Sequence, residues 1–145
     1  MKLTEIKLPA AVIHSEFACT NFDDLDDLSN LLAYCFEGAH SATTLLVDCS
    51  GWAYKIAGCT QHKQKPLRQL FKGSRSRIAL ELNRTKKLST LDFYEVLTKR
   101  LVQNPEWWMN NDGIVDLDAV GKVFEASSNL AEVMQNLGWF SPEVY

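Results

Sequence analysis

The sequence lacks the segments that direct a chain into or across a membrane. No apolar run approaches the roughly 18 residues that a membrane-spanning helix requires. Glu5 and Lys7 interrupt the start of the chain, where a secretion signal has an unbroken apolar stretch. We therefore expect a small, soluble, cytoplasmic protein that makes no contact with a membrane.

Cysteine is scarce as well. The chain has four cysteines, Cys19, Cys35, Cys49 and Cys59. A secreted scaffold of this length usually carries more cysteines at tighter spacings. We expect these four to be reduced and to pack as small apolar side chains. Two disulfides, for which three pairings exist, are the alternative.

The chain also lacks the motifs that identify common enzymes and metal sites. It has no Gly-x-Ser-x-Gly elbow, no glycine-rich phosphate loop and no His-Glu-x-x-His. Cys59 and His62 have the spacing of half a zinc site, but no second close pair follows them. Aligning Gly113 with the glycine of an EF-hand puts Trp108 and Ala119 at ligand positions, which excludes calcium. We expect no cofactor and no metal.

What the chain does have is the composition of an ordinary globular domain. Its 145 residues are 46% hydrophobic and 23% charged, which is enough apolar material for one core. Strand patterns come first and helical patterns come last, an order that favours the α+β class. We expect a single domain, residues 1–145, with a small, mainly antiparallel sheet of about four strands around a central hairpin. Helices pack against this sheet and fill the C-terminal third.

Alternating apolar residues predict the strands. A hairpin over residues 43–57 turns on Ser50-Gly51 and pairs Val47 with Tyr54 on one apolar face. The other extended segments are residues 2–8, 11–17 and 78–82.

Apolar residues at steps of three and four, preceded by capping residues, predict the helices. Asn21 caps the first helix, and four aspartates crowd its positive N-terminal end. Ser89 caps a later helix, with Asp92 three residues on. The predicted helices begin near residues 22, 66, 90, 116 and 130, and residues 106–113 form a loop.

Charge is distributed unevenly along the chain. Residues 1–54 and 88–145 each carry a net charge of −6, whereas residues 55–87 carry ten lysines and arginines against one acid, a net charge of +9. Such a basic segment attracts phosphate groups or an acidic protein surface. This favours a non-catalytic binding protein whose basic central face takes an anionic partner, either nucleic acid or an acidic protein. The residues expected to bind the anion are Lys63, Lys65, Arg68, Lys72, Arg75, Arg77, Lys86 and Lys87.

The same charge pattern also fits a purely structural role. Acidic helices that fold over the basic segment would neutralise it inside one domain. Lysine and arginine on a solvated face are also ordinary features of protein surfaces.

A second functional hypothesis is a protein–protein inhibitor of the immunity or antitoxin kind. It would present an acidic helix or a tryptophan loop to a basic target, since exposed tryptophans are common interface anchors. The interaction residues would be Asp23, Asp24, Asp26, Asp27, Trp107 and Trp108.

A third hypothesis is a metal-dependent nuclease. Asp48 ends one predicted strand and Glu81 lies on another, among basic residues that would hold a phosphodiester. Two carboxylates can bind Mg²⁺ and activate water. Asn83 stands where such sites often carry a lysine, so we favour binding over catalysis.

Overall fold

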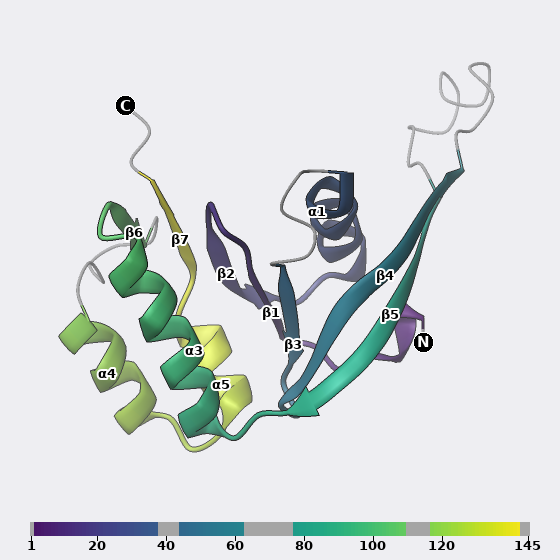
Figure 1. Cartoon of the computed structure of the whole chain (residues 1–145). Coiled ribbons are helices and arrows are strands. Elements are labelled where there is room, and N and C mark those ends of the chain that lie inside the picture. Colours follow the sequence, from purple (N-terminus) through teal and green to yellow (C-terminus); the bar gives the residue numbers. More distant parts are fainter. Residues whose placement is uncertain (1, 38–43, 63–76, 110–116, 143–145) are drawn as a thin grey trace.

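One antiparallel sheet runs through the molecule, with helices on both of its faces (Figure 1). The computed structural model describes residues 2–37, 44–62, 77–109 and 117–142. The elements in chain order are η1 (Leu3–Glu5), β1 (Ala10–Ile13), β2 (Ala18–Phe22), α1 (Leu25–Glu37), β3 (Leu45–Asp48), β4 (Trp52–His62), β5 (Arg77–Lys87), α3 (Thr90–Gln103), β6 (Trp107–Met109), α4 (Leu117–Ala126), α5 (Leu130–Asn136) and β7 (Trp139–Pro142).

The sheet is larger than the sequence predicts. It has seven strands in the order β5-β4-β3-β1-β2-β7-β6, where about four were expected. The fold class is confirmed, because the molecule is a single α+β domain with its last three helices in the C-terminal third. None of the helices in the described ranges is both long and apolar enough to cross a membrane.

Each face of the sheet is buried under its own helices. Helix α1 covers one face, where Leu28 packs in a core with Leu46. Helices α3, α4 and α5 cover the other face, where Phe93 packs in a second core with Val47. The neighbouring residues Leu46 and Val47 therefore point into opposite cores, and both are fully buried.

Most described helices begin at the residues that the sequence predicts. In α3, Ser89 Oγ accepts a hydrogen bond from Asp92 N at 3.1 Å, and Asp92 Oδ2 accepts one from Ser89 N at 3.0 Å. Asn129 caps α5. The cap of α1 is Asp24 and not Asn21, which lies in β2. The helix expected after residue 66 lies outside the described residues.

Two predictions of local structure are wrong, one for a strand and one for a loop. Leu3–Glu5 forms the 3-10 helix η1 where the sequence predicts a strand over residues 2–8. Trp107–Met109 forms the strand β6 in a segment predicted as a loop, and it pairs with Trp139–Pro142 in the tail. This pairing joins segments about thirty residues apart, which a local sequence pattern does not reveal.

The hairpin of β3 and β4 confirms the predicted turn but not the predicted register. Leu46 pairs with Tyr54 and Val47 pairs with Ala53, one residue away from the expected alignment. A shift of one residue moves every side chain of a strand to the opposite face. Both faces of the sheet are apolar here, so either alignment buries apolar pairs and the pattern alone does not select one.

Gly51 closes this turn in a conformation that favours glycine. Its φ of 94° lies in the left-handed region, and its carbonyl oxygen accepts a 2.7 Å hydrogen bond from Leu88 N. A Cβ at this position would collide with the Leu88 carbonyl oxygen. The turn is therefore locked to the segment that leads from β5 into α3.

We expect Gly51→Ala to lower the free energy of unfolding by about 2 kcal/mol or more, because it adds both backbone strain and a steric clash. Gly58→Ala, in the strand β4 that follows this turn, is the matched control. A Cβ at Gly58 meets only Glu81 Cβ, at 3.9 Å, so its effect should stay below about 1 kcal/mol. Urea unfolding measures both variants, and equal losses of stability would contradict this account of the turn.

Candidate functional site

Beyond the turn, β4 and β5 form a two-stranded ribbon at the edge of the sheet. Strand β3 is paired with β4 only up to Tyr54, whereas the pairing of β4 with β5 continues to His62 and Arg77. Figure 1 shows this ribbon leading away from helices α3–α5. Five of the predicted anion-binding residues fall outside the described residues, in the segment that joins the two strand ends: Lys63, Lys65, Arg68, Lys72 and Arg75.

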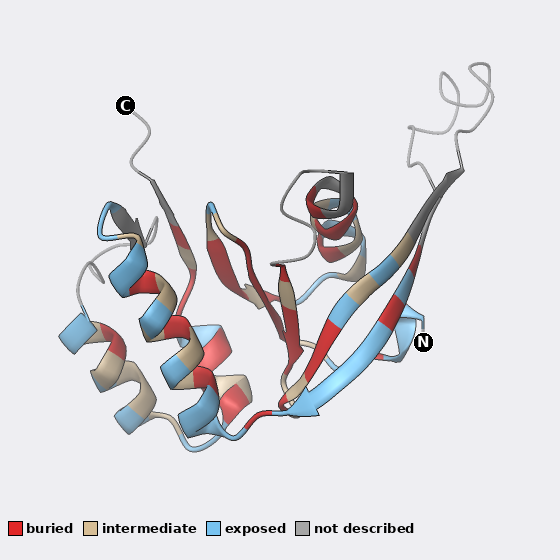
Figure 2. Cartoon of the chain, in the orientation of Figure 1, coloured by how far each residue is buried: buried red, intermediate tan, exposed pale blue. Residues whose placement is uncertain are grey.

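The two faces of the ribbon differ. Leu80 and Leu82 point toward α1 and are buried with it. The opposite face carries Lys55, Asn83 and Thr85, all exposed. Figure 2 shows the pale blue, exposed stretch along β5. The ribbon thus presents one polar face to solvent.

A cluster of cations, Arg84, Lys86 and Lys87, lies where the ribbon meets the rest of the sheet; we call it the basic cluster. All three residues are exposed. The Arg84 guanidinium lies 4.3 Å from the centre of the Trp52 ring, and Lys87 Nζ lies 5.9 Å from it. Contacts of this kind stabilise a cation over an aromatic face by about 0.5–1 kcal/mol at exposed sites. Two positive charges are therefore held together beside one half-buried tryptophan.

The position of Arg84 depends on a buried carboxylate. The Arg84 guanidinium also lies 5.9 Å from the centre of the Tyr54 ring, and the Tyr54 hydroxyl donates a hydrogen bond to Asp48 Oδ2 at 2.9 Å. Asp48 Oδ1 accepts hydrogen bonds from Ser50 N, Ser50 Oγ and Trp52 N at 3.0, 2.6 and 3.1 Å. Burial and the contact with Asp48 raise the pKa of Tyr54, so the hydroxyl keeps its proton at neutral pH. Asp48 therefore organises the turn and fixes the cation at the same time.

Asp48 and Glu81, the carboxylates considered for a nuclease, are not brought together. The register places Asp48 level with Trp52, whereas Glu81 pairs with Gly58, six residues further along β4. At the rise of a β-strand this is about 20 Å. Within the described residues, no group of three or more potential ligands is close enough to hold a metal ion. Asp48 has a structural role that accounts for its burial.

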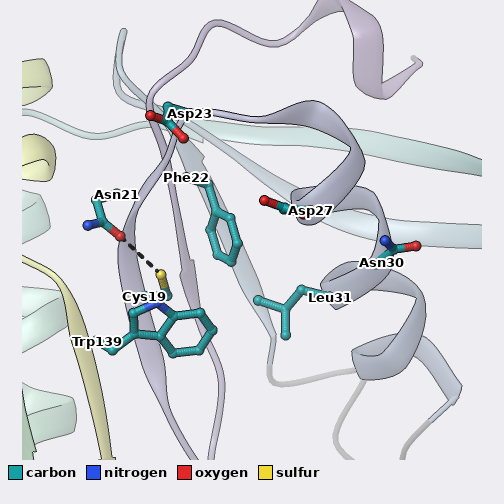
Figure 3. Close-up of a pocket in the computed structure, with 8 residues that line it drawn as sticks. All are labelled: Cys19, Asn21, Phe22, Asp23, Asp27, Asn30, Leu31 and Trp139. Atoms are coloured by element: carbon teal, nitrogen blue, oxygen red, sulfur yellow. Dashed lines mark hydrogen bonds between the residues drawn. The ribbon is translucent and has the colours of Figure 1, made fainter. Parts of the chain in front are cut away.

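The four aspartates of the inhibitor hypothesis also separate by role. Asp24 Oδ1 accepts hydrogen bonds from Asp26 N and Asp27 N at 2.8 and 3.1 Å and so caps α1. Asp23 and Asp27 instead lie at the rim of a pocket of about 520 Å³ between α1, β2 and the start of β7 (Figure 3). Asp26 is exposed on the helix but is not among the residues that line the pocket.

The cysteines offer no reactive thiol in the part of the chain that is described. Cys19, Cys35 and Cys49 are free, as the sequence predicts. Burial raises the pKa of Cys19 to about 12 and that of Cys35 to about 11, so neither forms a thiolate at neutral pH. Trp107 and Trp108 belong to the edge strand β6, and their side chains lie outside the described set.

Comparison of the chain with protein families, with curated proteins and with solved structures gave no match. The two features that bear on function are therefore the basic cluster beside Trp52 and the pocket between α1, β2 and β7.

Sequence reasoning missed Arg84 as a binding residue. The charge pattern alone did not show that Arg84 rests on the aromatic rings of Trp52 and Tyr54. The sequence did contain a signal for the position of Arg84. In a strand that alternates with a period of two, Arg84 falls on the same face as Leu80 and Leu82.

We expect Asp48→Ala to destabilise the fold by about 3 kcal/mol or more, because it leaves the Tyr54 hydroxyl and two backbone N–H groups without an acceptor. Asp118→Ala, an exposed change in the first turn of α4, is the matched control and should cost less than about 1 kcal/mol. The free energies come from urea unfolding followed by circular dichroism. A loss for Asp48→Ala no greater than that of the control would contradict the structural role.

Proposed function

We propose that the chain is a non-catalytic binding protein that holds nucleic acid by its phosphate groups. The binding surface is centred on the basic cluster, which lies on the α1 side of the ribbon of β4 and β5. The observation that carries the proposal is the arrangement of Arg84 and Lys87 over Trp52, in which two exposed cations lie against one half-buried aromatic ring.

Arg84 is suited to phosphate because its orientation is set before a ligand arrives. Its contacts with the rings of Trp52 and Tyr54 restrict the guanidinium to one region of the surface. Arginine donates two parallel hydrogen bonds to phosphate oxygens, and less side-chain entropy is lost on binding when the guanidinium is already oriented. A lysine next to it adds a second charge without further geometric demands.

The exposed face of the ribbon favours nucleic acid over an acidic protein. Tight protein–protein interfaces depend on aromatic or large apolar anchors. The described residues on this face, on the other side of β5 from Arg84, are polar or small, among them Lys55, Ala57, Glu81, Asn83 and Thr85. A two-stranded ribbon of this kind fits the width of the DNA major groove, and polar side chains there make phosphate and sugar contacts.

The charge of the chain supports the same surface. Residues 55–87, which span both strands of the ribbon and the segment between them, carry ten cations and one acid. Most of the binding free energy would come from release of counterions, with little sequence readout.

The test is fluorescence anisotropy of labelled single- and double-stranded DNA and RNA over a salt series. We expect the logarithm of the association constant to fall linearly with the logarithm of salt concentration, by about 0.9 per duplex phosphate neutralised. Arg84→Glu combined with Lys87→Glu should weaken binding at least about tenfold and lower this slope by about two.

Lys99→Glu combined with Lys122→Glu is the matched control, since it makes the same change of charge at exposed positions on α3 and α4. It should leave the slope unchanged. Equal losses for the two double variants would contradict the assigned surface. Competition by polyglutamate at the same charge concentration as DNA would show that an acidic protein is the better partner.

A further inference from the structure

A pocket of about 520 Å³ opens on the side of the sheet that α1 covers (Figure 3). Its apolar wall consists of Phe22, Leu31 and Trp139, with the side chains of Phe22 and Leu31 facing each other. The remaining lining residues are Cys19, Asn21, Asp23, Asp27 and Asn30. The pocket therefore combines an aromatic and aliphatic interior with a polar rim.

The aromatic wall is held in place by neighbouring rings. Trp139 meets the edge of Phe22 with ring centres 5.7 Å apart and an interplanar angle of 71°, and it contacts Phe17 at 5.8 Å. In the same pocket, Cys19 Sγ donates a hydrogen bond to Asn21 Oδ1 at 3.4 Å, which orients the side-chain amide of Asn21. Trp139 is half-buried. Among the described residues, cations lie over the rings of Trp52 and Tyr54 in β4, and none lies over the ring of Trp139.

The charged residues that line the pocket are both acidic. Asp23 and Asp27 stand at its rim, and both are exposed. From residue 8 to residue 54 the chain has no lysine or arginine, so no cation from the same segment offsets them. The negative potential at the rim and the electron-rich face of an indole favour the same kind of ligand, a cation that carries an apolar stem.

We infer that this pocket binds an organic cation, an alkylammonium or guanidinium group on a short aliphatic chain. The aliphatic part lies between Phe22 and Leu31, while the charged group lies near Trp139 and is neutralised by Asp27 and Asp23. The inference is independent of nucleic-acid binding, because the basic cluster contributes nothing to this pocket. The cation is either a free small molecule or a lysine or arginine side chain of a partner protein.

The test is a ¹H–¹⁵N NMR titration of the full chain with butylguanidinium, followed at the Trp139 indole N–H. We expect a saturable shift of that signal. Butylurea, which has the same shape without the charge, should bind at least about tenfold more weakly. Asp23→Asn combined with Asp27→Asn should weaken butylguanidinium binding by a similar factor.

Asp118→Asn combined with Glu125→Gln is the matched control, since it removes two exposed acidic charges from α4, on the other face of the sheet from the pocket. It should leave the dissociation constant within about twofold. Equal binding of butylurea, or equal losses in both double variants, would overturn the inference.

A titration with the peptide Gly-Arg-Gly distinguishes the two sources of the cation, a free small molecule and a side chain of a partner protein. If the peptide binds more tightly than butylguanidinium, the cation is a side chain of a partner protein. If the peptide binds equally or more weakly, the cation is a small molecule.

Discussion

The buried carboxylate of Asp48 is the interaction on which the rest of the structure depends. It is only 2% exposed, and it accepts hydrogen bonds from the turn that follows β3 and from the hydroxyl of Tyr54. By holding Ser50 and Trp52 in the turn segment it favours the observed register of β4 against β3, and so it favours the observed choice of side chains that face α1. Through Tyr54 it also positions Arg84 on the surface. One polar group therefore links the hairpin, the core and the proposed phosphate contact.

The two candidate sites lie at opposite margins of one core. Trp52, beside the basic cluster, and Trp139, in the wall of the pocket, both pack against the core that α1 covers. The charges around them have opposite signs, because the cations come from the ribbon and the aspartates come from the start of α1. An anion and an organic cation would therefore bind without competing for the same surface.

Local signals in the sequence predicted part of this structure. The caps of α3 and α5 follow from Ser89 and Asn129, because capping depends on residues three positions apart. The hairpin register did not follow, since both faces of the sheet are buried and apolar pairs fit either alignment. The pocket was also beyond prediction, because it joins residues 19–31 to Trp139 across most of the chain. Charge segregation indicated the basic region, but only the fold shows Arg84 resting on Trp52.

The central claim is that the Asp48 network presents Arg84 to phosphate. The most direct measurement follows the side-chain N–H signals of Arg84 and Trp52 by NMR while a short DNA duplex is added. The structure predicts that these two signals shift together and saturate, and that the signals of α4 stay in place. Shifts confined to α3, α4 and α5, with Arg84 and Trp52 unchanged, would contradict the claim.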